Sequence, residues 1–138
     1  MTTIGIDPGK KGGLCALDGR GEIISAIPMP DVLAQTVDWF DEHLDWGDPN
    51  HGNVHVFIEQ VGAMPGQGVT SMFTFGKGYG ELIGLVAGLQ IPYTLVRPKE
   101  WQKTYWTARK GQNTKLKALE ALSRLYPDQN LLKYTIDH

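Results

Sequence analysis

Two carboxylates stand where apolar strands are predicted to end, and such a pair can hold a metal ion. Asp7 closes the run Thr2–Asp7 (TTIGID), and Glu59 lies near the end of Val54–Val61 (VHVFIEQV). Burying a carboxylate beside a hydrophobic strand is costly unless it is paired or bound to a metal. A single acid at a strand end is usually a turn or cap residue. On two neighbouring strands, however, the oxygens can converge on one divalent cation, and hard oxygen ligands favour Mg²⁺ or Mn²⁺, as in nucleases with two-metal sites.

Positive charge is concentrated in the second half of the chain. Residues 1–60 hold three Lys/Arg and ten Asp/Glu, whereas residues 61–138 hold ten and five. Within the segment Arg97–Lys117 there are seven basic residues and one acid; the basic residues are Arg97, Lys99, Lys103, Arg109, Lys110, Lys115 and Lys117. Two interpretations stay open: a solvated face, or a surface that binds nucleic-acid phosphates by releasing counterions. Trp101, Tyr105 and Trp106 in this segment can stack on bases or anchor it to the core.

The apolar pattern predicts a three-stranded meander followed by alternating helices and strands. The expected strands are Thr2–Asp7, Gly12–Leu17, Ile23–Pro28, Val54–Val61 and Pro92–Arg97, and the expected helices are Asp31–Asp45, Thr70–Leu89, Pro98–Trp106 and Asn113–Tyr126. A meander that feeds an alternating α/β half is the ribonuclease H-like arrangement. We therefore expect an α/β protein with a mixed five-stranded sheet flanked by helices.

The helices are expected to turn one apolar face to the sheet. Asp31 is the candidate N-cap of the first helix, with Leu33, Val37, Phe40 and Leu44 on its inner face. The long second helix should bury Met72, Phe75, Tyr79, Leu82, Ile83, Val86 and Leu89. Its glycines Gly80, Gly84 and Gly88 lie on another face, and because glycine weakens a helix, three in register predict close packing, against the sheet or across a two-fold axis. The last helix should bury Leu116, Leu119, Leu122 and Leu125.

Composition narrows the class of protein. With 138 residues, 41% of them hydrophobic and 20% charged, the chain has the size and apolar content of one domain. No apolar run reaches the roughly 18–20 residues of a membrane span, and the N-terminus lacks the pattern of a signal peptide. A lone Cys15 fits the reducing cytoplasm. Zinc and nucleophilic catalysis are not supported, because the four histidines lack ligand spacing and Cys15 has no evident base nearby.

Two motifs give the carboxylates a family context. Ile4–Gly9 (IGIDPG), followed by Gly12-Gly13, resembles the first motif of the RuvC family of Holliday junction resolvases, and Phe57–Val61 (FIEQV) resembles the second. The glycine-rich helix around Gly80 and the run Val96–Lys103 are similar to the phage and organelle branch of that family. The resemblance covers nearly the whole chain, and the two motifs at this distance are more specific than either alone.

The resemblance implies a homodimeric, Mg²⁺-dependent endonuclease that makes paired nicks in four-way DNA junctions, a crossover junction endodeoxyribonuclease, in a bacterial or phage-infected cell. Mn²⁺ is expected to substitute for Mg²⁺. Asp7 and Glu59 match the first two metal ligands of the family. Lys115 matches a lysine that assists catalysis, and Lys103, with Arg109 and Lys110, is a candidate contact to DNA phosphates. For each of these cations, a plain surface role is the alternative.

The chain departs from the family pattern in two places. The family completes its site with a C-terminal acidic motif and helix, whereas this sequence reads Tyr134–His138 (YTIDH) where that motif should begin. We therefore expect a single nuclease domain over residues 1–138 that lacks this motif, unless Asp137 replaces one ligand or the natural protein continues. The second departure is a Gly62–Pro65 loop where the bacterial branch has an aromatic wedge. Met64 could act as the wedge, or the helix could bring up Phe73 and Phe75 for that role, although both phenylalanines are expected in the core.

Another class of function remains open on the sequence. A catalytically deficient protein of the same fold that binds branched DNA would also lack the last acids. Retention of both Asp7 and Glu59 favours the nuclease, because a pure binding protein has no need of these carboxylates. A phosphotransferase of the actin type also has a DxGxxxG loop, but it needs two such domains, and 138 residues supply one.

Overall fold

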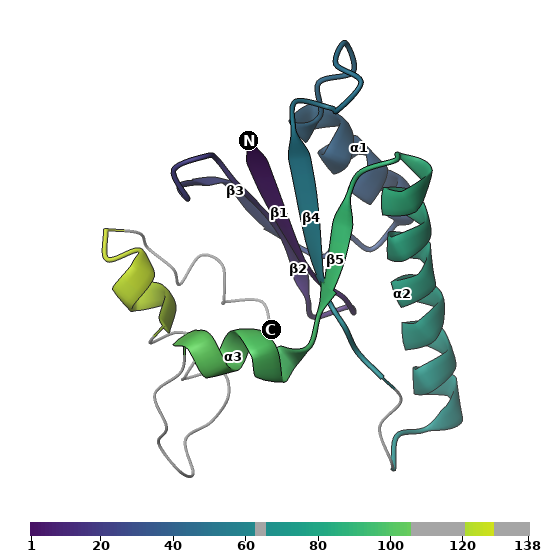
Figure 1. The fold of residues 1–138 in the computed structure, drawn as a ribbon. Coiled ribbons are helices and arrows are strands. Elements are labelled where there is room, and N and C mark those ends of the chain that lie inside the picture. The colour runs from purple at the N-terminus through teal and green to yellow at the C-terminus, as the bar shows by residue number, and fades with distance from the viewer. Residues whose placement is uncertain (63–65, 106–120, 129–138) are drawn as a thin grey trace. The chain divides into compact units, whose positions relative to one another are not determined.

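The computed structural model describes residues 1–62, 66–105 and 121–128. The chain divides into two compact units, Met1–Val96 and Arg97–His138. The first unit contains, in chain order, β1 (Thr2–Asp7), β2 (Gly13–Leu17), β3 (Ile23–Pro28), α1 (Leu33–His43), β4 (Val54–Glu59), α2 (Val69–Gly88) and β5 (Tyr93–Val96) (Figure 1). The second unit contains α3 (Pro98–Tyr105) and a helical stretch at residues 121–125.

The five strands form one mixed sheet in the order β3-β2-β1-β4-β5. The neighbours β3, β2 and β1 are antiparallel, whereas β1, β4 and β5 run parallel to one another. This arrangement confirms the predicted ribonuclease H-like fold. The change from antiparallel to parallel pairing occurs at β1, so this strand is central in both the sheet and the chain's topology.

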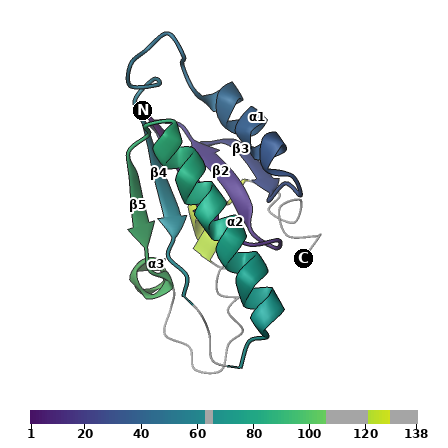
Figure 2. The same ribbon diagram turned by 90° about the vertical axis from the view of Figure 1, so that its right-hand side faces the viewer.

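Strand alternation separates the two faces of the sheet. Both α1 and α2 lie on one face (Figure 2), and there the strands bury Ile4, Ile6, Leu14, Ala16, Val54, Val56 and Ile58 against Trp39, Phe40, Leu44, Leu82, Val86 and Ile91. Successive side chains of a strand point to opposite faces. Consequently Gly5, Cys15 and Phe57 lie on the other face, where Phe57 is 40% exposed.

The first helix is rotated relative to the prediction. It begins at Leu33, and its N-cap is Val32 without a side-chain hydrogen bond, so Asp31 is not the cap. Its buried residues are Thr36, Trp39 and Phe40, followed by Leu44 after its end, whereas Leu33 and Val37 are exposed. The reason lies in the packing of its largest side chain. The indole N–H of Trp39 donates to Ser25 Oγ on β3 at 3.1 Å, and its ring packs edge-on against Phe40.

The long helix α2 follows the prediction on its inner face and departs from it on its outer face. Leu82 and Val86 are buried, and the other expected inner residues are half-buried. Gly80, Gly84 and Gly88 are exposed, and a Cβ built on any of them would meet nothing within 4 Å, so packing on the sheet does not explain them. Although α2 has 20 residues, neither it nor any other described helix is long and apolar enough to cross a membrane.

The predicted final helix is described only at its end. Leu122 is half-buried, but Leu125 is 53% exposed, so the inward position predicted for Leu125 is wrong. Residues 106–120, which include Leu116 and Leu119, lie outside the described residues.

A tight turn joins β1 to β2 directly after Asp7. The backbone N–H of Gly12 donates to Gly9 O at 3.1 Å, and Gly9 has a φ of +103°, in the left-handed region. A Cβ on Gly12 would lie 1.9 Å from the carbonyl oxygen of Asp7. The turn can therefore fold back onto the end of β1 only with glycine at position 12.

Substituting Gly12→Ala is expected to destabilise the protein by about 1–3 kcal/mol, because the added methyl group collides with backbone rather than with a movable side chain. Thermal unfolding followed by circular dichroism measures the change. Gly19→Ala is the matched control, since its Cβ would lie 3.6 Å from its nearest atom at an ordinary φ. Equal melting temperatures for the two variants would contradict this account of the turn.

Candidate functional site

Asp7 and Glu59 are brought together by the pairing of β1 with β4. These strands are parallel neighbours, and Ile6 pairs with Ile58. The two acids are the next residue on each strand, so they stand level at the same edge of the sheet, about 5 Å apart along the hydrogen-bonding direction. Because Ile6 and Ile58 both point into the core, alternation turns both carboxylates to the opposite face. The sequence prediction that the two acids lie on neighbouring strands is therefore confirmed.

The strands on either side define the surroundings of the pair. Asp7 pairs with Gly13 of β2, and Glu59 pairs with Val96 of β5. Neither neighbour carries a competing charge. Asp7 is exposed and Glu59 is half-buried, and each already takes part in an interaction within the chain.

The donor chemistry of this edge fits a hard divalent cation. Mg²⁺ is commonly held by one or two carboxylates together with waters and substrate phosphates. No group of three or more His, Cys, Asp or Glu side chains arranged to hold a metal occurs within residues 1–62, 66–105 and 121–128. Among described residues, the edge therefore offers a pair of carboxylate ligands.

Cysteine and histidine chemistry is not organised around this edge. Burial raises the pKa of the Cys15 thiol, which disfavours the reactive thiolate. His51 is engaged elsewhere, with its Nε2 2.8 Å from Leu89 O, and the Nε2 of His55 lies 2.8 Å from Thr94 Oγ1.

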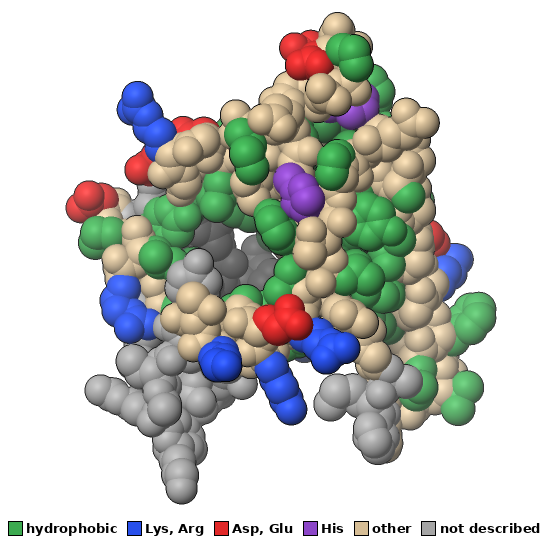
Figure 3. Space-filling view, viewed as in Figure 1, with side chains coloured by type: hydrophobic (Ala, Val, Ile, Leu, Met, Phe, Trp, Pro, Cys, Tyr) green, Lys and Arg blue, Asp and Glu red, His purple; other side chains and the backbone are tan. Residues whose placement is uncertain are grey.

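The basic residues predicted to bind DNA are described only in part. Lys103 is exposed on α3, which also carries Lys99, and Figure 3 shows basic side chains gathered over that helix. Arg109, Lys110 and Lys115 lie outside the described residues, as does Asp137. Their predicted roles therefore remain predictions.

Two phenylalanines near the start of α2 differ sharply in environment. Phe73 is 74% exposed, so its predicted core position is wrong; it lies on the outer face of the helix together with Val69, which is 86% exposed. Phe75 packs inward, stacked on Tyr79 with a centroid separation of 6.2 Å and close to Gly9. Met64, the other candidate wedge, is outside the described residues.

Sequence reasoning missed a second positive region beside the acids. Lys10 and Lys11 follow Asp7-Pro8-Gly9 in the β1–β2 turn, and both are exposed. They were overlooked because residues 1–60 are acidic as a whole, with three cations against ten acids. Their position directly after the first acidic motif was the available signal.

Comparison with solved structures places this fold. Thermus thermophilus RuvC in complex with a Holliday junction substrate is similar, with a TM-score of 0.62 over 92% of this chain and 79% of that chain, at 11% sequence identity. A second Thermus thermophilus RuvC structure aligns with a TM-score of 0.49 and 16% identity, covering 92% of this chain and 81% of that chain. No family model and no curated protein matches the sequence. The chain thus has a RuvC-like fold.

Mn²⁺ is expected to bind at the paired acids. In NMR spectra, substoichiometric Mn²⁺ should broaden amide signals around both Asp7 and Glu59, because a paramagnetic ion relaxes nearby nuclei. Asp7→Asn or Glu59→Gln should weaken this effect by roughly 10-fold or more, since each removes one charged ligand. Asp38→Asn is the control, because it makes the same Asp-to-Asn change at an exposed position of α1. Broadening that persists in Asp7→Asn would show that the ion binds elsewhere.

Proposed function

We propose that this protein is a Holliday junction resolvase: a Mg²⁺-dependent, structure-selective endonuclease that makes paired nicks in four-way DNA junctions. The observation that carries the proposal is the level placement of Asp7 and Glu59 at the ends of adjacent parallel strands, within a RuvC-like fold. The two sequence motifs that hold these acids resemble the RuvC family independently of the fold. We expect the protein to cleave DNA junctions in the cytoplasm of a bacterial or phage-infected cell.

The reaction is hydrolysis of one phosphodiester bond in each cut strand. A water oxygen forms a bond to phosphorus while the bond from phosphorus to the leaving deoxyribose oxygen breaks; one proton of the water passes to solvent, and the leaving oxygen acquires a proton. A bound Mg²⁺ supplies a more acidic water and neutralises charge on the phosphate. Asp7 and Glu59 would hold the Mg²⁺ ion at this edge of the sheet, where we expect the DNA strand to approach.

Cations of the chain complete the proposed site. Lys115 would place its ammonium group near the developing negative charge, a contribution that acts mainly in the transition state. Lys103, Arg109 and Lys110 would bind phosphates and hold the DNA in register without reading its sequence. Selectivity for branched DNA would then come from shape.

Paired nicks require two active sites, so we propose a homodimer that uses the outer face of α2. On this face Gly80, Gly84 and Gly88 are exposed with open space above their Cα atoms. Two exposed apolar side chains, Val69 and Phe73, continue the same face toward the start of the helix. A bare backbone allows a second helix to approach closely, and a two-fold axis brings the same surface to both partners.

Cleavage of a labelled four-way junction tests the proposed reaction. With Mg²⁺ we expect nicks in two opposed strands, no cutting of a linear duplex of the same sequence, and no cutting in EDTA. Asp7→Asn should reduce the cleavage rate by at least about 100-fold while junction binding is kept, because it removes a metal ligand but no DNA contact. Asp38→Asn on α1 is the control and should cut normally.

Each other outcome has a definite meaning. Junction binding without any Mg²⁺-dependent cutting would replace the nuclease with the branched-DNA-binding protein. Cutting that survives Asp7→Asn would move the active site away from this edge. No preference for the junction over duplex would contradict the proposed substrate.

Substitution on the glycine face tests the dimer. Gly84→Leu should strengthen the isolated helix, by up to about 1 kcal/mol, because leucine is the better helix former and the Cβ meets nothing in the monomer. In a close-packed dimer the same side chain would separate the helices. Sedimentation velocity should therefore show a dimer for the unmodified protein and a monomer for Gly84→Leu. Ala34→Leu is the control, because it introduces a leucine at an exposed position of α1. An unchanged dimer would exclude this face.

A further inference from the structure

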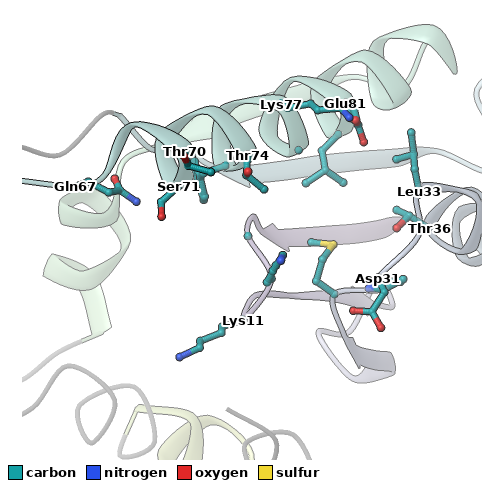
Figure 4. A pocket seen from close by; sticks show the side chains of 17 residues that line it. Lys11, Asp31, Leu33, Thr36, Gln67, Thr70, Ser71, Thr74, Lys77 and Glu81 are labelled. Atoms are coloured by element: carbon teal, nitrogen blue, oxygen red, sulfur yellow. The ribbon is translucent and has the colours of Figure 1, made fainter.

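A groove of about 970 Å³ lies in the first unit, beside the edge that carries the acids. One wall is the first four turns of α2, from Thr70 to Leu82, and the opposite wall is the β1–β2 turn; the segment between β3 and α1 closes the far end (Figure 4). Gly9, which lines the groove, is two residues after Asp7. Only Pro8 therefore separates Asp7 from the first lining residue of the groove.

The α2 wall presents a row of hydrogen-bond donors. Thr70, Ser71 and Thr74 line the groove with Gln67, and Thr74 lies four residues after Thr70 and three after Ser71, spacings that make it a neighbour of both on the helix surface. All four side chains are exposed, and none of them has a hydrogen-bond partner among the described residues. Figure 4 shows Ser71 projecting from α2 toward the opposite wall and Gln67 on the segment just before the helix. Their donors are thus available to a ligand in the groove.

The facing wall supplies positive charge. Lys10 and Lys11 line the groove from the β1–β2 turn, and neither forms an ion pair with a described residue. They are two of only three cations in residues 1–60, a stretch with ten acids. The third, Arg20, lies in the β2–β3 turn at the opposite end of the sheet, because Leu17 pairs with Thr3 whereas Gly13 pairs with Asp7. A polyanion would be repelled by most of this half and attracted here.

The charges also give the groove a direction. Its acidic lining residues, Asp31 and Glu81, lie at the end near α1 with Lys77 beside Glu81, whereas Lys11, Gln67 and Ser71 lie at the other end (Figure 4). An anionic ligand would therefore favour the end with Lys11, away from the two acids.

We propose that this groove binds the sugar–phosphate backbone of a DNA strand next to the scissile phosphate. Ammonium, hydroxyl and amide donors are the groups that bind phosphate oxygens, and they do so without reading bases. The carboxylates are on the sheet face opposite α1 and α2, so a strand held at Asp7 and Glu59 would pass around the end of β1 at Gly9 to enter the groove between Lys11 and Ser71. The inference rests on the proposed function, because it takes the ligand of the acidic edge to be DNA.

Binding of a fluorescent four-way junction in EDTA, measured over a range of KCl concentrations, tests the groove. Lys10→Gln and Lys11→Gln should each weaken binding by roughly 5-fold or more and lower the slope of log affinity against log salt by about 1; the double variant should lower it by about 2. The loss should be equal for junctions of different sequence. Arg20→Gln removes the same charge at the far end of the sheet and should change neither quantity.

A cross-linking measurement is independent of the lysines. In a Cys15→Ala background, a photoreactive group attached to Ser71→Cys should cross-link to the junction, and one attached to Glu42→Cys on exposed α1 should not. Thermal unfolding confirms that each variant is folded.

The outcomes separate the groove from the proposed function. If the unmodified protein binds and cuts the junction but the lysine variants behave like Arg20→Gln, the groove is overturned and the resolvase stands. If Ser71→Cys fails to cross-link to a bound junction, the groove is likewise overturned. If the unmodified protein binds no DNA, the proposed function fails and the groove's ligand fails with it.

Discussion

The parallel pairing of β1 with β4 is the constraint on which the candidate site depends. Ile6 and Ile58 pair within the sheet and are buried on the same side, so the next residue of each strand must be turned to the opposite face at the same level. The hydrophobic burial that fixes the register of the two strands therefore also fixes the distance between Asp7 and Glu59. A slip of one residue in the pairing of β1 with β4 would turn one carboxylate toward the core. Burying an unpaired carboxylate there would strongly destabilise the fold.

The turn after β1 extends this constraint to a second surface. Gly12 lets the chain fold back within contact of the Asp7 carbonyl, and Lys10 and Lys11 of the same turn line the groove together with residues at the beginning of α2. Phe75 of α2 packs close to Gly9, so the helix and the turn are held at a fixed separation. The turn after β1 thus links the acids to the groove.

Helix α2 has three surfaces with different chemistry. Leu82 and Val86 bury one surface in the core, a row of hydroxyls lines the groove, and the glycines expose bare backbone on the outer surface. In the proposed resolvase these surfaces stabilise the fold, bind the DNA backbone and pair the two subunits. A single helix would then relate the spacing of two active sites to the path of the strands between them.

The sequence by itself determined the order of the elements, the strand end at Asp7, the place of Glu59 close to the end of its strand, and the buried face of α2, because these follow from apolar periodicity and local turn residues; the structure ends β4 at Glu59, two residues before the predicted Val61. Tertiary structure alone decided the rest. The rotation of α1 depends on the hydrogen bond from Trp39 to Ser25, which joins segments 14 residues apart. The apolar periodicity of the sequence does not predict this contact. The exposure of Phe73 and of the glycines depends on which side of α2 meets the sheet. The groove joins residues about 60 positions apart, from Lys10 to Ser71, and charge counted along the chain averages such a local feature away.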